Sequence, residues 1–175
     1  MRTIFISVMV LLTGPMGTSW AGPIQIHRSE PPEAVYYANA YADHYGLPRS
    51  LVHAVIEQES GWDPHAVSPK GALGIMQLMP DTARQYGVQH PFSKVENIGA
   101  GTRYLADLVR AFHGDLRLAV AAYYCGNHPI QRWGLRYSNA DVFQYVSSVR
   151  ALYVRDLARH EASTVNPDNR KTVQP

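Results

Sequence analysis

The stretch Ser50-Leu-Val-His-Ala-Val-Ile-Glu-Gln-Glu-Ser-Gly-Trp62 has the apolar spacing of an amphipathic helix. Its stripe consists of Leu51, Val52, Val55 and Ile56. At about 100° per residue, Glu59 falls close to the centre of this stripe, whereas Glu57 points to the opposite, solvated side. Burial without a cationic partner raises the pKa of a carboxyl group, so Glu59 is a candidate general acid. The alternative is a structural glutamate that caps a loop or pairs with an arginine.

Helical spacing recurs along the rest of the chain. Helices are predicted over residues 33–45, 48–60, 81–86 and 97–113, after Asp115 as an N-cap, and from Ser138-Asn-Ala-Asp141, which has a capping-box pattern. Alternating period-two segments are absent from the sequence. We therefore predict an all-α fold, with at most a short hairpin within residues 63–80.

Residues 63–80 combine the marks of a loop with those of a core segment. They contain Gly71, Gly74 and three prolines, yet most of the residues between 72 and 79 are apolar. Such a loop must be buried, and its glycines allow close backbone approach or positive φ. This composition fits the wall of a ligand groove as well as a tight turn in the core.

The first 21 residues have the features of a signal peptide. Arg2 precedes an apolar run from Ile4 to Leu12, and Ser19-Trp20-Ala21 is a small-x-small pattern suited to signal peptidase. The run is short for a bilayer span, so a retained membrane anchor is the weaker alternative. We expect an exported protein.

The remaining chain is long enough for one domain with its own core. We expect an extended N-terminal arm at residues 22–32 and the domain at residues 33–160. Residues 161–175 are polar and have no apolar stripe, which predicts a disordered tail.

Charge and cysteine content exclude several classes of protein. The net charge is +2 and basic residues are scattered singly, so we expect no nucleic-acid partner. Cys125 is the single cysteine and cannot form an internal disulfide; it is expected to pack in the core, with a reactive thiol as the alternative. The eight histidines show no HExxH motif, so we predict no metal and no cofactor.

Four ordered segments resemble the motifs of the soluble lytic transglycosylase family. Glu59-Ser60 followed by Trp62 resembles Glu-Ser-x-aromatic, and Ser68-Pro-Lys-Gly-Ala-Leu-Gly-Ile-Met-Gln77 resembles Ser-x-x-Gly-Ala-x-Gly-Leu-Met-Gln. Asn97-Ile-Gly-Ala-Gly101, followed by Tyr104-Leu105, is similar to the third motif, and Ala121-Ala-Tyr123 to Gly126 is similar to Ala-Ala-Tyr-Asn-x-Gly. The resemblance covers roughly residues 35–155.

The resemblance implies a lysozyme-like domain that cleaves the β-1,4 bond between N-acetylmuramic acid and N-acetylglucosamine in peptidoglycan. One acid protonates the leaving oxygen and then, as a base, takes the proton of the sugar's C6 hydroxyl, which leaves a 1,6-anhydro end. The paired carboxylates of ordinary glycosidases are then unnecessary. Asp63 is the nearest second carboxyl group, and a turn or cap next to Pro64 explains it.

Matching by position implies the site residues Glu59, Ser68, Gln77, Met79, Tyr123 and Tyr145. Glu59 would be the acid and base, and the next four would line the groove that holds the sugars. Tyr145 resembles a late family tyrosine whose phenol lies near the catalytic glutamate. The alternatives are packing for Met79 and the tyrosines and a turn cap for Ser68, while Gln77 must find polar partners in backbone or sugar.

One position departs from the family pattern. Tyr124 stands where the family motif has asparagine, and a phenol cannot make the hydrogen bonds of an amide. Asn127 could take over that role after a local shift. A goose-type lysozyme, which uses water, and a non-catalytic wall-binding scaffold remain as alternative functions.

Small single-domain members of the family often serve specialised assemblies. The resemblance therefore implies a periplasmic enzyme acting on peptidoglycan glycan strands, with a secretion, conjugation or pilus machine as a possible partner.

Overall fold

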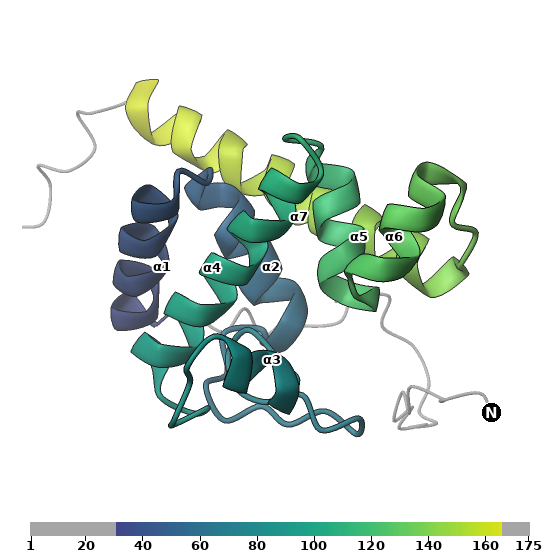
Figure 1. Ribbon diagram of the computed structural model, residues 1–175. Coiled ribbons are helices and arrows are strands. Elements are labelled where there is room, and N and C mark those ends of the chain that lie inside the picture. The colour runs from purple at the N-terminus through teal and green to yellow at the C-terminus, as the bar shows by residue number, and fades with distance from the viewer. Residues whose placement is uncertain (1–30, 166–175) are drawn as a thin grey trace, which may run out of the picture.

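Seven α-helices and one 3₁₀ turn make up residues 31–165, the part of the chain that this computed structural model describes. In chain order they are α1 (Pro32–Tyr45), α2 (Arg49–Ser60), α3 (Pro80–Gln85), α4 (Lys94–Ala111), α5 (Leu116–Cys125), α6 (Asn127–Trp133), η1 (Gly134–Arg136) and α7 (Ala140–Val165). Figure 1 shows α1 beside α4, α5 and α6 together on the other side, and α7 running across one end. The predicted all-α fold is confirmed.

Helix α2 lies at the centre of the core, where it packs against α1 and α7. Its residues Ser50 to Ile56 are all buried, which confirms the apolar stripe inferred from the sequence. Gly61 ends the helix in the left-handed conformation, with φ 58°. Glu57 differs from the sequence prediction, because its side chain is only 27% exposed and lies 3.9 Å from the Arg155 guanidinium of α7.

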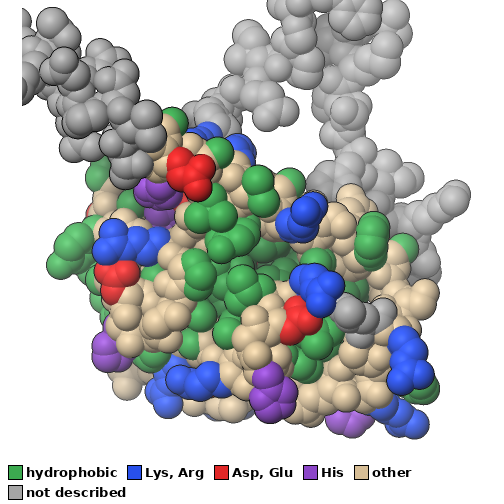
Figure 2. All heavy atoms as spheres, turned by 90° about the horizontal axis from the view of Figure 1, so that it is seen from above, with side chains coloured by type: hydrophobic (Ala, Val, Ile, Leu, Met, Phe, Trp, Pro, Cys, Tyr) green, Lys and Arg blue, Asp and Glu red, His purple; other side chains and the backbone are tan. Residues whose placement is uncertain are grey.

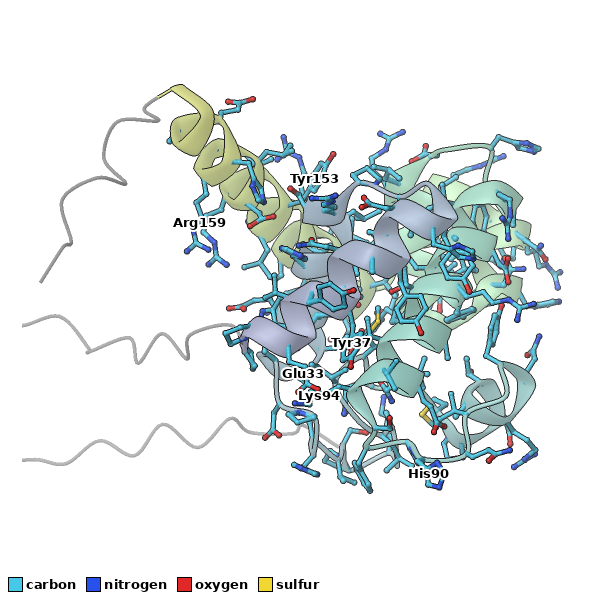
Figure 3. All side chains as sticks on the ribbon, turned by 90° about the vertical axis from the view of Figure 1, so that its left-hand side faces the viewer. Glu33, Tyr37, His90, Lys94, Tyr153 and Arg159 are labelled. Carbon is cyan, nitrogen blue, oxygen red and sulfur yellow. The ribbon has the colours of Figure 1, made fainter. Side chains whose placement is uncertain are left out.

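Small residues allow α1 and α4 to lie close together. Ala34, Ala38 and Ala42 form the buried face of α1, and a Cβ atom added at Gly99 of α4 would lie 2.8 Å from the Tyr41 ring. At the first turns of the two helices, the Lys94 ammonium donates a hydrogen bond to the Glu33 carboxylate (Figure 3). The short side chains therefore set the separation of the two helices.

The loop between α2 and α3 folds back on itself and is tied to α4. Two isolated antiparallel bridges, Val67 with Leu73 and Leu73 with Leu78, are the only β-pairing among residues 31–165, in keeping with the predicted short hairpin. Asn97 of α4 is fully buried and bonds this loop twice: its Oδ1 accepts from Met76 N at 2.8 Å, and its Nδ2 donates to the Leu73 carbonyl at 3.0 Å. Its Nδ2 also donates to the carbonyl of Pro91, in the connection between α3 and α4, at 2.8 Å.

Gly74 makes this attachment possible. Its φ is +77°, and an added Cβ would lie 2.3 Å from both Asn97 Nδ2 and the Pro91 carbonyl. Only glycine fits there.

Several predicted helix boundaries were wrong. Helix α4 begins at Lys94 and not at Asn97, because Ser93 is an N-cap that accepts from Glu96 N. Asn139 caps α7, since its Oδ1 accepts from Asp141 N at 2.9 Å and Val142 N at 3.2 Å, and the helix starts after Ser138. Helix α6 was missed, because it is short and has one buried residue, Ile130.

The C-terminal helix extends beyond the predicted end of the domain at residue 160 and reaches Val165. Asp156 and His160, four residues apart, contact each other and stabilise the helix just before this final stretch. The stretch is polar, so no apolar stripe in the sequence predicted that it is helical. Residues 1–30 and 166–175 lie outside the described residues, and with them the predicted signal peptide, nearly all of the arm and most of the tail. None of the helices within residues 31–165 is long and apolar enough to cross a membrane.

Asn97→Ala is expected to lower the free energy of unfolding by about 3 kcal/mol, because it leaves the buried Met76 N–H and the Pro91 carbonyl without these partners, whereas the Leu73 carbonyl still accepts from Leu78 N. Asn139→Ala is the matched control, since it removes only an exposed helix cap and is expected to cost about 1 kcal/mol. Urea unfolding of both variants measures the difference. Equal losses would contradict the central role of Asn97.

Candidate active site

Glu59 and Tyr145 meet where α2 packs on α7. Glu59 lies in the last turn of α2 and is partly buried, and the hydroxyl of Tyr145 donates a hydrogen bond to its Oε1. Tyr145 is 6% exposed. The pairing predicted from a resemblance in the sequence is therefore present as a direct contact between two side chains 86 positions apart.

Burial raises the pKa of Glu59 from 4.5 to about 7, and the hydrogen bond from Tyr145 lowers it by a smaller amount. No salt bridge to Glu59 is found among residues 31–165. The pKa of Tyr145 is raised well above its usual value, first by burial and then by the adjacent Glu59, so the phenol keeps its proton and remains a donor. Close to neutral pH, a substantial fraction of Glu59 holds a proton.

Tyr123 of α5 completes the buried surroundings of the acid. It is 8% exposed, its hydroxyl donates to the Met76 carbonyl at 2.8 Å, and its pKa is raised by burial and by the charge of Glu59. The Tyr104 ring lies 5.1 Å away, centroid to centroid. Tyr123 thus joins α5 to the loop while facing the acid.

A pocket of about 300 Å³ lies beside this group. It is lined by Gln77, Leu78, Met79, Thr82, Tyr104, Tyr123, Tyr124, Cys125 and Gly126. Three of the predicted groove residues, Gln77, Met79 and Tyr123, are therefore brought together, and Met79 is 44% exposed. Ser68, Tyr145 and Glu59 itself are not among the lining residues, and Tyr123 and Tyr124 are the lining residues that interact with the charge of Glu59.

Gln77 and Ser68 both hold the loop in shape. The Gln77 amide donates to the carbonyls of Ala66 at 3.0 Å and Gly74 at 2.9 Å, with a backbone φ of 48°. Ser68 Oγ accepts from Ala72 N at 2.9 Å, the turn cap considered above as its alternative role. Both side chains have a structural contact, and any contact with sugar is an additional role.

Tyr124 stands at the position of the fourth motif where the family has asparagine. Its ring stacks on Tyr145, with centroids 4.6 Å apart and planes 26° apart, while 43% of the residue is exposed. Asn127, considered above as a substitute for the missing asparagine, lies in the first turn of α6, and its buried Oδ1 accepts no hydrogen bond from the residues described.

No second carboxylate pairs with Glu59 within residues 31–165. Asp63 accepts a hydrogen bond from His65 N at 2.9 Å, which confirms the predicted turn. No acidic side chain within residues 31–165 contributes to the pKa shift of Glu59. One protonated carboxyl beside a pocket can donate a proton and take one back.

Comparison with known proteins identifies the family. The family model described as the transglycosylase SLT domain matches residues 36–146. The chain belongs to the transglycosylase SLT domain family.

Relatives of this SLT domain are longer proteins. The membrane-bound lytic murein transglycosylase F 1 of Alkalilimnicola ehrlichii is 38% identical over 96 residues, which are 51% of this chain and 19% of that protein. A transglycosylase of Enterobacteria phage PRD1 is 36% identical over 92 residues, 53% of this chain and 34% of the phage protein. The chain thus spans about a third or less of these relatives' length.

Solved structures support the same assignment. The 70 kDa soluble lytic transglycosylase of Escherichia coli superimposes with a TM-score of 0.64 and 28% identity, over 70% of this chain and 24% of the other. The lysozyme-like fold expected from the motifs is confirmed.

Two structural residues of the SLT domain were not assigned roles from the sequence. Asn97 fixes the loop, and Ser60, next to the acid, donates from its Oγ to the Ile75 carbonyl at 2.7 Å. An asparagine within an apolar helical stripe could have signalled the first. The ring contact of Tyr124 had no signal, because it depends on how α5 and α7 pack.

A possible metal-binding group lies elsewhere on α2 and α7. His53, Asp156 and His160 offer ligand atoms within 4.8 Å of one another, and Asp156 Oδ2 lies 3.4 Å from both His53 Nδ1 and His160 Nε2. Sequence spacing could not reveal this group, since its members come from two helices. Ion pairing with protonated imidazoles explains the same distances, and either arrangement ties α2 to α7.

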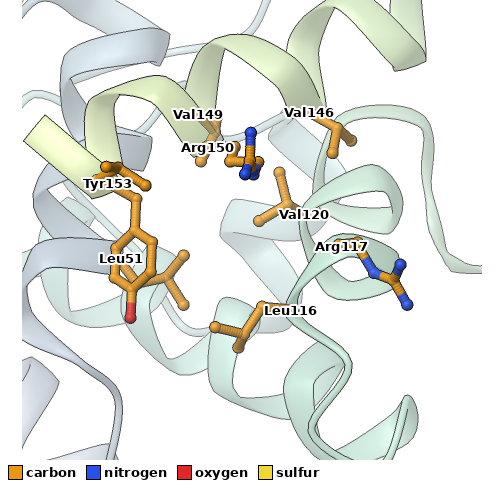
Figure 4. A pocket seen from close by; sticks show the side chains of 9 residues that line it. Leu51, Leu116, Arg117, Val120, Val146, Val149, Arg150 and Tyr153 are labelled. Carbon is orange, nitrogen blue, oxygen red and sulfur yellow. The ribbon is translucent and has the colours of Figure 1, made fainter.

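A second pocket, of about 230 Å³, is apolar. Its lining comes from α2, α5 and α7 (Figure 4) and consists of Leu51, Leu116, Arg117, Val120, Val146, Val149, Arg150, Tyr153 and Val154. Apolar side chains gather on the face of the molecule seen from above, with basic side chains among them (Figure 2). The pocket contains no candidate acid.

Cys125 is half-buried, and burial raises the pKa of its thiol. A raised pKa disfavours the thiolate that a nucleophile needs. The structure therefore favours the packing role over the reactive alternative.

Glu59→Gln is expected to stabilise the protein at neutral pH. Because the folded pKa of about 7 exceeds the ordinary value of 4.5, the folded state binds this proton more tightly, and the resulting stability is lost as pH rises from 4.5 to 7. Glutamine does not titrate, so its advantage should grow over that range to about 3 kcal/mol. Urea unfolding from pH 4 to pH 8 measures it, with Glu57→Gln on the same helix as the control. A difference independent of pH would contradict the burial of an ionised Glu59.

Proposed function

We propose that this protein is a peptidoglycan lytic transglycosylase that cleaves the β-1,4 bond between N-acetylmuramic acid and N-acetylglucosamine and leaves a 1,6-anhydro end. The observation that carries the proposal is the largely buried carboxyl of Glu59, with a pKa near 7 and the Tyr145 phenol as its partner. Membership of the SLT domain family supports the same reaction.

One carboxyl group can serve both halves of this reaction. Glu59 donates its proton to the glycosidic oxygen as the bond from that oxygen to the anomeric carbon breaks. The muramoyl 2-acetamido oxygen stabilises the anomeric carbon by bonding to it. The carboxylate of Glu59 then takes the proton of the C6 hydroxyl while that oxygen attacks the anomeric carbon and displaces the acetamido group. Glu59 ends protonated, and no water is consumed.

Tyr145 assists the step in which Glu59 is charged. Its hydroxyl donates to the carboxylate oxygen, and a hydrogen bond to the charged form stabilises that form. The pocket lined by Gln77, Met79 and Tyr123 is linked to the acid through Tyr123 and offers polar and aromatic surface to a sugar. The loop residues that shape this pocket are held by Asn97 and Ser60.

The two alternative functions differ in products. A goose-type lysozyme would use water and leave a reducing end, and a scaffold would bind the wall without cleaving it. The absence of a second carboxylate acting on Glu59 within the described residues favours the transglycosylase over a hydrolase with paired carboxylates. The protonated carboxyl next to a pocket favours an enzyme over a scaffold.

Digestion of purified peptidoglycan followed by mass spectrometry tests the reaction. The protein is expected to release muropeptides with 1,6-anhydro ends, each lighter by one water than the hydrolysed form, and Glu59→Gln is expected to release none. Reducing ends would assign the protein to the lysozymes. Binding to sacculi without products from either protein would indicate a scaffold.

We further propose that the enzyme is exported to the periplasm by residues 1–21 and opens the wall locally for a secretion, conjugation or pilus machine. The apolar run and small-x-small pattern support export. The similarity to a phage protein named transglycosylase supports the cleavage reaction itself.

Complementation tests export and local cleavage together. In a strain without the gene, assembly of the machine is expected to be restored by the parent chain, but not by Glu59→Gln or by a chain without residues 2–21. Full assembly with either altered chain would contradict the corresponding part of the proposal.

A further inference from the structure

We propose that Tyr124 is a positioning residue, whose ring holds Tyr145 so that the Tyr145 hydroxyl stays against Glu59. The role rests on the proposed transglycosylase function, because it concerns the same acid. It assigns a purpose to the position at which this chain departs from the family motif.

The contacts form a short series that begins at the surface. Tyr124 of α5 is 43% exposed and lines the pocket, and its ring stacks on Tyr145 of α7 with centroids 4.6 Å apart. Tyr145 is buried and donates to Glu59 of α2. Tyr124 therefore covers the Tyr145 ring on the side toward α5, and it joins three helices at the acid.

The ring of Tyr124, and not its hydroxyl, makes this contact. Its hydroxyl has no hydrogen bond to any residue within 31–165 in the structure, whereas the ring planes lie 26° apart in a stacked arrangement. A planar ring limits the rotation of a stacked neighbour, and an asparagine side chain has no such face. The departure from the family motif thus replaces hydrogen-bonding groups with an aromatic cover.

The charged and titratable groups around the acid are few. Tyr145 of α7 donates to Glu59, and Tyr123 and Tyr124 of α5 interact with its charge; Asp141 of α7 interacts with Tyr124. Loss of the Tyr145 hydrogen bond is expected to raise the pKa of Glu59, because that bond favours the charged carboxylate.

Three substitutions separate a ring contact from other roles. Tyr124→Leu keeps apolar cover but removes the stacking face, Tyr124→Phe keeps the face, and Tyr124→Asn restores the residue of the family motif. Phe143→Leu is the matched control, since Phe143 is an aromatic residue of α7 that is 75% exposed. Circular dichroism verifies that each variant is folded, and the high exposure of Tyr124 makes folding of all three expected.

The first measurement follows the Glu59 carboxyl by ¹³C NMR as a function of pH, and does not depend on activity. The Glu59 titration is expected to move to higher pH in Tyr145→Phe and in Tyr124→Leu. In Tyr124→Phe the Glu59 titration is expected to stay close to that of the parent, and in Phe143→Leu it is expected to be unchanged. A parental titration in Tyr124→Leu would overturn the proposal.

The second measurement is a double-mutant cycle on peptidoglycan cleavage. Tyr124→Leu and Tyr124→Asn are expected to lower kcat by about tenfold with little change in KM, and Tyr124→Phe is expected to recover most of the loss. In the Tyr145→Phe background, Tyr124→Leu should have almost no further effect, because both changes remove the same contact. Independent, multiplicative losses, or a loss confined to KM, would show that Tyr124 acts on the sugar directly and would overturn the proposal.

The two measurements distinguish failure of this inference from failure of the proposed function. A shifted Glu59 titration with no anhydro products from the parent would retain the positioning role and reject the transglycosylase. Anhydro products from the parent together with an unshifted Glu59 titration in Tyr124→Leu would retain the transglycosylase and reject the positioning role.

Discussion

The burial of one carboxyl group between two helices is the constraint on which the rest of the structure depends. Glu59 lies in the last turn of α2, where the helix dipole places partial negative charge, and is shielded by α5 and α7. Both effects oppose ionisation, and the Tyr145 hydroxyl is the only group that favours it through a hydrogen bond within the described residues. The surrounding core must be stable enough to hold a group that is costly to bury when charged.

The loop that shapes the pocket is held by polar contacts with the core. Asn97 provides two hydrogen bonds from α4, Ser60 one from the helix of the acid, and Tyr123 one from α5. A Cβ at Gly101 would lie 2.5 Å from the Met76 sulfur, so the small residues of α4 allow the loop to lie directly on that helix. The residues of the family motifs therefore form one packed unit, in which Ser60 and Tyr123 contact the loop and also lie next to Glu59 in sequence or interact with its charge.

Much of this arrangement could be predicted from the sequence, and the remainder has physical causes. Apolar spacing located the core helices and the inward direction of Glu59, because both follow from the 100° period of a helix. Spacing could not show that Tyr124 stacks on Tyr145, or that His53 lies near Asp156, because both contacts depend on the packing of separate helices. The missed α6 has one buried residue, Ile130, and residues 161 and 162 in the extension of α7 are exposed, so no apolar pattern marked these segments.

A pKa near 7 suits a carboxyl group that must act twice. A much lower pKa would leave Glu59 ionised and unable to protonate the leaving oxygen, while a much higher one would delay the loss of its proton to that oxygen. Burial alone raises the pKa, and the Tyr145 hydrogen bond opposes that rise, so the two effects together set an intermediate value. Any residue that holds Tyr145 in place therefore influences both halves of the reaction, and a ring that covers Tyr145 can do so without contacting the reacting atoms.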